Sequence, residues 1–312
     1  MPLQFLGIGR GQLPTAIFRP PATDEAMQCV TDTILENAMK TQREKAEKFK
    51  ALHEQAEAFV IPNPWDILSA RLLAGLGFKA LATTSAGFAN SLGKLDGQVT
   101  RDEAIEHCRD LCSVTDLPVS ADLENCFADD PAKVGETILL GAQAGLVGGS
   151  IEDYSGDPAS TIYDFNLAVE RVQAAVEAAR SLDFPFMLTA RAENLIRGKN
   201  DLDDTVRRLQ AFEAAGADVL YAPGLTTLDE VQLVTSALTK PVNVLAPVMK
   251  GVTLKQLSSA GAKRISTGGA LARAAITALL RAGTEMLEGG SFGWSSDLTG
   301  SAEVKKLLLD ES

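Results

Sequence analysis

The fold is decided by the stretch Pro118-Val-Ser-Ala-Asp-Leu-Glu-Asn-Cys126 and its echo Ser150-Ile-Glu-Asp-Tyr154. Each stretch contains a short apolar run bounded by small residues, which predicts a buried strand. Each strand ends in a pair of acids, which are Asp122 with Glu124 and Glu152 with Asp153. Four converging acids without His or Cys would repel one another unless a cation lay between them, and all-oxygen ligation favours a hard ion such as Mg²⁺. The stretches therefore predict a divalent-metal site, with helix capping by the acids as the alternative.

Strand and helix patterns alternate along most of the chain. Predicted strands lie at 59–66, 80–85, 118–124, 150–154, 186–193, 218–224, 241–246 and 264–269, with predicted helices between them and a Gly-bearing loop through Asp96 after the second strand. Eight successive strand–helix units predict a (β/α)8 TIM barrel rather than an open sheet. We expect an N-terminal arm over 1–40 that includes the start of a helical extension, the barrel over 41–288, and a C-terminal tail over 289–312.

Composition limits the functional classes. The 312 residues are 46% hydrophobic and 22% charged, which is typical of a soluble globular protein, and no apolar run is long enough to span a membrane. The net charge of −12 argues against binding to nucleic acid or to anionic membranes. The four cysteines match neither a disulfide scaffold nor a zinc site, so we expect free thiols. We predict a cytoplasmic protein, with an N-terminal organelle-targeting segment as the alternative.

Polar residues follow the predicted strands, where barrel enzymes place their active sites. They are Asn63, Trp65, Asp66, Ser85, Asp122, Glu124, Glu152, Asp153, Arg191, Glu193, Tyr221, Asn243 and Ser266. Arg191 offers a planar fork for a substrate carboxylate or phosphate, and its alternative role is a structural ion pair with Glu193 or Glu152. The turn Ser266-Thr-Gly-Gly269 resembles a phosphate cradle, although such glycines also simply permit a turn.

Two kinds of catalysis are disfavoured by where the basic residues stand. Lys79, Lys240 and Lys263 precede strands and so face the opposite mouth of the barrel, which argues against a Schiff-base aldolase. The only histidines, His53 and His107, lie on predicted helices. Imidazole-ligated zinc and histidine acid–base catalysis are therefore not expected.

Six motifs together carry a family resemblance. They are Asn63-Pro-Trp-Asp-Ile-Leu-Ser-Ala70, Thr84-Ser-Ala-Gly87, Ala121-Asp-Leu-Glu124, Ile151-Glu-Asp153, Thr189-Ala-Arg-Ala-Glu193 and Arg264-Ile-Ser-Thr-Gly-Gly-Ala-Leu-Ala272. In this order, over residues 42–288, they resemble the isocitrate lyase/phosphoenolpyruvate mutase superfamily. The resemblance implies an enzyme that uses Mg²⁺, or Mn²⁺ in its place, to make or break a carbon–carbon or carbon–phosphorus bond beside an α-oxycarboxylate.

The resemblance also implies roles for individual residues. Asp122 would hold the metal, with Glu124, Glu152 and Asp96 reaching it through waters. Ser85, Ala86 and Gly87 would bind the substrate's carboxylate or carbonyl oxygen, and Arg191 its carboxylate. The rest of the substrate pocket would be formed by Trp65, Glu193, Tyr221 and Asn243. The superfamily's tetramers imply a homo-oligomer, dimer or tetramer, whose last helix is exchanged between subunits.

One departure from the family pattern narrows the reaction. Isocitrate and methylisocitrate lyases carry a Lys-Lys-Cys-Gly-His or Lys-Arg-Cys-Gly-His motif after the fourth strand, whereas this chain has Tyr154-Ser-Gly-Asp-Pro-Ala-Ser-Thr-Ile-Tyr163. The cysteine acid–base is missing, as are the Lys and Asn that phosphonate-forming mutases use there. Decarboxylation of an oxaloacetate-like acid needs no cysteine as proton donor and therefore fits this loop. A methylisocitrate- or dimethylmalate-lyase-like cleavage is the other expected activity.

The sequence leaves alternatives open for the proton donor and for the class of reaction. Tyr154, Tyr221 or a metal-bound water would deliver any proton, and structural packing is the alternative role for both tyrosines. Within the family, the alternative activity is phosphonopyruvate hydrolysis or mutation of phosphoenolpyruvate. Outside it, the alternative is a catalytically silent barrel that binds a ligand.

Overall fold

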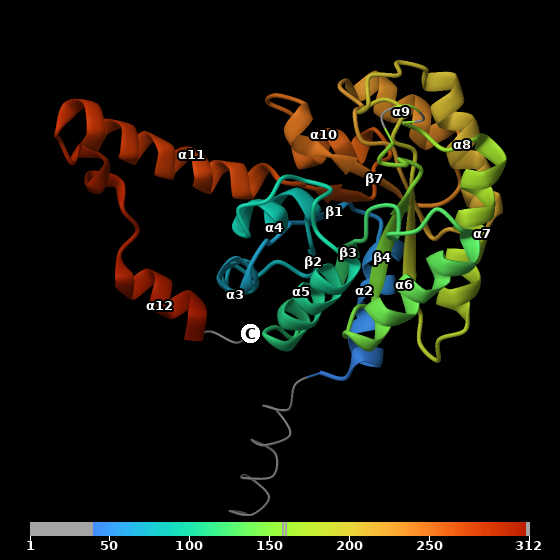
Figure 1. The fold of residues 1–312 in the computed structure, drawn as a ribbon, viewed down its shortest axis with the longest axis horizontal. Helices are drawn as coiled ribbons and strands as arrows, with labels where there is room; N and C mark the ends of the chain where they lie inside the picture. The colour runs from blue at the N-terminus through green and yellow to red at the C-terminus, as the bar shows by residue number, and fades with distance from the viewer. Residues whose placement is uncertain (1–39, 158, 160, 310–312) are drawn as a thin grey trace, which may run out of the picture. The chain divides into compact units, whose positions relative to one another are not determined.

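The computed structural model describes residues 40–157, 159 and 161–309. Its centre is an eight-stranded parallel sheet. The strands are β1 (Phe59–Ile61), β2 (Leu81–Ala82), β3 (Val119–Asp122), β4 (Gly148–Glu152), β5 (Met187–Arg191), β6 (Val219–Tyr221), β7 (Val242–Leu245) and β8 (Arg264–Ser266). The helices lie around the strands (Figure 1).

The sheet closes on itself. Its strand order is β1-β8-β7-β6-β5-β4-β3-β2, so that β1 and β2 are the two ends of the ladder. The amide of Ala82 donates a hydrogen bond of 3.1 Å to the carbonyl of Pro62, which directly follows β1. This bond joins the two ends and closes the cylinder, as the eight strand–helix repeats predicted.

The α-helices are α2 (Gln42–Glu54), α3 (Ile67–Gly75), α4 (Ser85–Ser91), α5 (Arg101–Ser113), α6 (Pro131–Gln143), α7 (Phe165–Arg180), α8 (Leu202–Ala214), α9 (Leu228–Ser236), α10 (Leu254–Ser259), α11 (Ala270–Thr284) and α12 (Ser301–Leu309). Those from α2 to α10 begin where the sequence offers a capping side chain, whereas α11 follows Gly269 without one. Thr41, Thr100 and Thr227 each form a capping box with the glutamate three residues on, which satisfies amides that the first turn leaves unpaired.

Helix α2 plugs the N-terminal mouth of the barrel. Its Phe49 and Leu52 pack with Phe59, Met187 and Val219, which are the first residues of β1, β5 and β6. Burying these side chains stabilises the fold by about 1.5–3 kcal/mol each. Apolar packing fills this mouth, whereas a cavity lined by polar side chains lies toward the C-terminal ends of the strands.

Helix α4 lies where the sequence predicted only a Gly-bearing loop, so that prediction was wrong. The Thr84 hydroxyl accepts a hydrogen bond from the Gly87 amide (3.3 Å) and caps the helix. A Cβ on Gly87 would stand 2.6 Å from the Thr84 methyl and 3.0 Å from Cβ of Trp65, so only glycine lets α4 lie this close to the strand ends. Gly and Ser lower helix propensity, and this hid the helix in the sequence.

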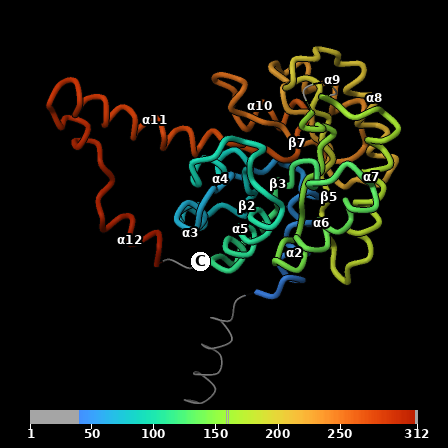
Figure 2. Tube along the Cα trace, viewed as in Figure 1, coloured from blue at the N-terminus to red at the C-terminus, as the bar shows by residue number. Residues whose placement is uncertain are grey.

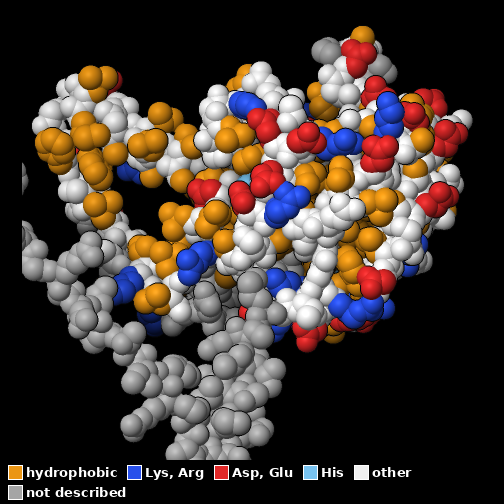
Figure 3. Space-filling model, turned by 60° about the horizontal axis from the view of Figure 1, so that its bottom comes forward, with side chains coloured by type: hydrophobic (Ala, Val, Ile, Leu, Met, Phe, Trp, Pro, Cys, Tyr) orange, Lys and Arg blue, Asp and Glu red, His pale blue; other side chains and the backbone are white. Residues whose placement is uncertain are grey.

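The C-terminal part leaves the barrel and returns. Helix α11 extends away from the strands and α12 comes back to pack on α3 of the same chain, where Arg71 donates a hydrogen bond to the carbonyl of Leu308 (Figures 1 and 2). Hydrophobic side chains gather along this extension, with Leu279 71% and Leu287 88% exposed (Figure 3). Exchange of the tail between subunits stays a prediction.

Two further expectations depend on which residues are described. The arm predicted over 1–40 lies almost wholly outside the described residues, as does Cys29. Cys108, Cys112 and Cys126 are buried free thiols, as the sequence predicted. Over the described ranges no helix combines the length and the apolar character that crossing a bilayer requires.

Candidate active site

A cavity of about 220 Å³ opens at the C-terminal ends of the strands. Many of the predicted site residues line it, namely Ser85, Ala86, Asp96, Asp122, Arg191, Glu193, Tyr221 and Asn243. They come from different strands and from the start of α4, and the parallel barrel brings them to one mouth. The predicted residues that do not line the cavity are Trp65, Asp66, Gly87, Glu124, Glu152, Asp153 and Tyr154.

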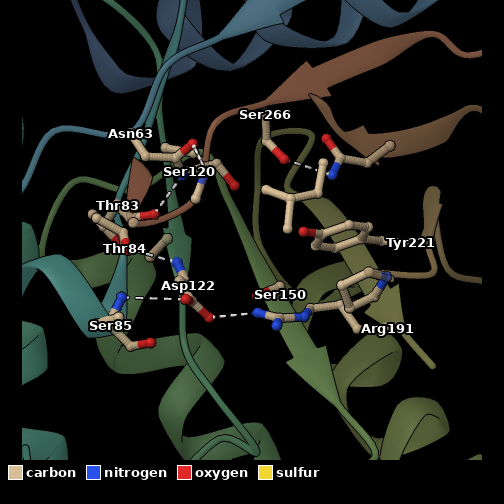
Figure 4. Close-up of a pocket in the computed structure, with 18 of the residues that line it drawn as sticks. Asn63, Thr83, Thr84, Ser85, Ser120, Asp122, Ser150, Arg191, Tyr221 and Ser266 are labelled. Carbon is tan, nitrogen blue, oxygen red and sulfur yellow. Dashed lines mark hydrogen bonds and ion pairs between the residues drawn. The ribbon is translucent and has the colours of Figure 1, made fainter. Parts of the chain in front are cut away.

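Asp122 lies at the centre of the site, at the last position of β3. Its Oδ1 pairs with Nη1 of Arg191 at 2.7 Å, and its Oδ2 accepts a hydrogen bond from the Ser85 amide at 3.2 Å (Figure 4). The carboxylate is thus held from two sides, by a guanidinium from β5 and by the first amide of α4. Such fixed contacts orient a catalytic carboxylate before any ligand arrives.

Arg191 is surrounded by acids. Besides Asp122, its Nη2 lies 2.8 Å from Oε1 of Glu193 and 3.0 Å from Oε2 of Glu152. Burial alone would lower the pKa of Arg191, but these three carboxylates raise it well above its usual value. The ion pairs that the sequence left as an alternative role are therefore present, and Arg191 has more negative charge around it than it can neutralise.

The excess of negative charge affects the pKa values of the neighbouring carboxyl groups. Burial, together with the charge of Glu193, raises the pKa of Glu152 well above its usual value despite the opposing effect of Arg191. Burial and the repulsion of Asp122 and Asp96 raise the pKa of Glu124 to about 7. Glu124 also has a left-handed backbone (φ 49°), which is strained for a glutamate and is common at functional sites.

This donor set fits a divalent cation that keeps part of its water shell. Within the described part of the chain, no three His, Cys, Asp or Glu side chains are grouped closely enough to hold a metal ion by themselves. A cation at Asp122 would therefore take its other ligands from water or substrate, as Mg²⁺ commonly does. The negative charge of Asp122 helps to raise the pKa values of Glu124 and Glu152. A cation bound at Asp122 would relieve this repulsion.

Asp153 does not join the other acids, so the predicted convergence of four carboxylates was wrong at this position. Its Oδ1 accepts a hydrogen bond from the Glu193 amide (2.8 Å), and its Oδ2 pairs with Nη1 of Arg208 (3.2 Å). Successive residues of a strand point to opposite faces, so Glu152 and Asp153 cannot both face the barrel interior. Asp153 instead ties β4 to the loop after β5 and to α8.

Tyr154 is also removed from the cavity. The guanidinium carbon of Arg197 lies 3.6 Å from the centre of the Tyr154 ring, and the same guanidinium pairs with Glu193 at 3.2 Å. Arg197 lines the cavity, whereas Tyr154 does not. Tyr154 therefore supports Arg197, and the catalytic role predicted for it finds no support in its position.

The turn that resembled a phosphate cradle is filled by the protein. The side-chain oxygen of Asn63 accepts hydrogen bonds from the amides of Thr267 (2.8 Å) and Gly268 (2.9 Å). The side-chain amide of Asn63 in turn donates to the carbonyl of Thr83 (2.8 Å). These amides are thus already bonded, which argues against phosphate binding at the turn.

Sequence reasoning missed two arginines that line the cavity. Arg197 follows Glu193 by four residues, in a turn where its amide donates to the Glu193 carbonyl (3.1 Å), and this spacing was the available signal. Arg264 opens β8 and lies deep inside the barrel, 6% exposed. It begins its strand, so a search confined to strand ends could not find it.

Comparisons with known proteins agree with this geometry. The family model for phosphoenolpyruvate phosphomutase matches residues 49–287. A crystal structure of a provisionally assigned lyase or mutase from Burkholderia cenocepacia is 52% identical with a TM-score of 0.83, covering 86% of this chain and 96% of that one. The 2-methylisocitrate lyase of Escherichia coli is 30% identical over 62% of this chain and 70% of its own length. The oxaloacetate decarboxylase of Paraburkholderia xenovorans is 29% identical over 62% of this chain and 66% of its own. The chain therefore belongs to the isocitrate lyase/phosphoenolpyruvate mutase superfamily.

Proposed function

We propose that this protein is a Mg²⁺-dependent lyase that cleaves a carbon–carbon bond of a small 2-oxo or 2-hydroxy dicarboxylic acid through an enolate-like intermediate. The observation that carries the proposal is the cavity carboxylate Asp122, held between Arg191 and the Ser85 amide. Relatives named as a 2-methylisocitrate lyase and an oxaloacetate decarboxylase support this reaction class.

The residues divide the work of the reaction between them. Asp122 would hold the cation, with Glu124, Glu152 and Asp96 on its hydration shell. When bound, the cation would supply positive charge beside the oxygen on C2, where negative charge develops in either kind of acid, and would lower the barrier by several kcal/mol. Ser85 and Ala86 line the cavity next to Asp122, and their polar groups would bind the substrate's carboxylate or carbonyl oxygen.

Proton delivery is best assigned to Tyr221. Its hydroxyl points into the cavity, and burial raises its pKa to about 12, so it holds its proton at neutral pH (Figure 4). Arg191 lies over the ring, with the guanidinium carbon 5.2 Å from its centre, and would stabilise a phenolate after proton transfer. Tyr154 lacks this access.

Carbon–carbon cleavage is preferred to carbon–phosphorus chemistry because of Asn63. The amides that would cradle a phosphate already donate to its side chain, as described above. The cavity is instead lined by Asp122, which would hold a cation, and by Arg191 and Arg197. A cation and guanidinium groups suit an oxo or hydroxy acid that chelates the cation through its carboxylate.

The proposal is tested by product analysis with purified protein and Mg²⁺. We expect carbon–carbon cleavage of oxaloacetate or of 2,3-dimethylmalate, detected as pyruvate, and no phosphate release from phosphonopyruvate. Phosphate release would favour the alternative activity. Thermal stabilisation by these acids without any turnover would instead support a ligand-binding barrel and contradict the proposed lyase.

A further inference from the structure

Arg264 forms part of the cavity floor inside the barrel. It is the first residue of β8, its side chain lines the cavity, and it is 94% buried because only 6% of its surface is exposed. Its guanidinium lies below the layer of Arg191, since its Nη2 donates to Thr189, which stands two residues before Arg191 on β5. A charge at this depth needs an explanation.

Among the described residues, the hydrogen-bond partners of this guanidinium are neutral. Its Nε donates to the side-chain oxygen of Asn243 (2.8 Å) and its Nη2 to the hydroxyl of Thr189 (2.9 Å). Its Nη1 has no hydrogen-bond partner among the residues that the structure describes. Burial lowers the pKa of Arg264 to about 10, with Arg191 adding to the lowering, so the group still carries its charge at neutral pH.

Arg264 and Arg191 differ in their ion pairs. Arg191 is paired with three carboxylates, whereas no salt bridge of Arg264 occurs among the described residues. The acids are therefore concentrated at the mouth, and a positive charge without a counter-ion is left at the floor. Burying such a charge is unfavourable unless an anion pairs with it for part of the working cycle.

Ser150 is a second unpaired group facing the same cavity. Its hydroxyl is buried and has no hydrogen-bond partner in the described ranges, and the residue lines the cavity from β4 (Figure 4). Buried hydroxyls are nearly always bonded, so two unpaired polar groups on the wall of one cavity indicate that a polar ligand completes them.

We propose that Arg264, with Ser150, forms an anion subsite that binds the distal carboxylate of a dicarboxylic acid whose other end is bound beside Asp122. This proposal rests on the proposed function, because the subsite lies in the same cavity and would bind the other end of the same substrate. Asn243 and Thr189 orient Arg264, and are positioning residues for it. A monocarboxylic acid leaves the subsite empty, so the floor selects for a second negative charge.

The subsite also favours one bond over another. A carboxylate that is paired with a guanidinium is a poor source of CO2. Decarboxylation would turn the charged group into neutral CO2 and so would break the ion pair. In a malate-like acid the 2-hydroxyl instead gives its proton to a cavity carboxylate, and the electrons of the C2–C3 bond move onto the distal carboxylate. A proton then returns to C3, giving a 2-oxo acid and a carboxylic acid. Arg264 stabilises the charge that gathers on the distal carboxylate.

Calorimetric binding of oxalate and succinate, with Mg²⁺ and again with a chelator, tests the subsite. Both carboxylates of oxalate are taken up in chelating a cation beside Asp122, whereas succinate has a distal carboxylate. In Arg264→Met we expect succinate to bind about ten- to hundredfold more weakly and oxalate to change less than threefold. Arg273→Met removes an exposed positive charge from α11 and serves as the matched control, with both affinities unchanged.

A second variant keeps the test independent of folding. Asn243→Asp places a carboxylate where Nε of Arg264 already donates, so it neutralises the guanidinium without removing it. We expect it to weaken succinate at least about tenfold and to spare oxalate. Unchanged succinate binding in either folded variant, equal loss of both ligands, or failure of the wild type to bind succinate would overturn the subsite. Turnover in the product assay with any of these results would leave the proposed lyase intact.

Discussion

Replacing Asp122 by Asn is expected to reduce kcat by at least about 10³-fold. The change keeps an oxygen that can accept the hydrogen bond of the Ser85 amide, but it removes the negative charge that pairs with Arg191 and would hold a cation. The side chain keeps its shape, so the loss reports the charge rather than a collapsed cavity. Steady-state kinetics with saturating Mg²⁺ measures it.

The matched control is Asp130→Asn. Asp130 stands on the same connection after β3, is exposed, and caps α6 by accepting from the Ala132 amide at 2.9 Å. Asn is as good an N-cap as Asp, so activity and stability should stay at wild-type values. An Asp122→Asn enzyme that retains a tenth of wild-type activity would show that this carboxylate does not carry the reaction.

Replacing Arg191 by Met is expected to destabilise the fold by about 3–5 kcal/mol at neutral pH, besides abolishing turnover. The variant leaves Asp122, Glu152 and Glu193 close together without the guanidinium that pairs with all three. Urea unfolding in the presence of a chelator measures the loss, because an added cation would replace part of the missing charge.

The pH dependence of this loss has a definite sign. Burial already raises the pKa of Glu152 above its unfolded value in the wild type, and without Arg191, which opposes this effect, the folded-state pKa of Glu152 rises further. The folded variant then binds more protons than the unfolded one, so its stability increases as pH falls from 8 toward about 4.5. A deficit that stays constant over this range would contradict the charge account.

Two further variants separate charge from shape. Arg191→Lys keeps a positive charge but loses the planar fork, so we expect most of the stability and little of the activity. Arg43→Met breaks a pair with Asp183 in which both side chains are more than half exposed, and should cost under about 1 kcal/mol.

The barrel and the centre of its site could be predicted because their signals are local. Apolar strands followed by amphipathic helices specify a (β/α)8 barrel, and the barrel alone brings Asp122 and Arg191 to one mouth. Neither inference needs the packing of particular side chains. The same logic placed Tyr221 and Asn243 on the cavity wall.

Other features depended on packing that the sequence does not display. Asp153 follows Glu152 directly, and only the strand's alternation assigns it to the opposite face. The steric need for glycine at position 87 was hidden as well, because it depends on the close approach of α4 to Trp65. The importance of Arg264 depends on its having neutral hydrogen-bond partners among the described residues, and the sequence context of one residue does not reveal that.

Metal removal is the most direct test of the central claim. This claim is that the acids at the C-terminal ends of β3 and β4 work with a divalent cation to cleave a carbon–carbon bond. Protein stripped by a chelator is assayed with oxaloacetate and 2,3-dimethylmalate while Mg²⁺ is titrated back. We predict no turnover without metal, and recovery that saturates with Mg²⁺ in the wild type but not in Asp122→Asn. Full activity in the stripped wild-type protein would contradict the account.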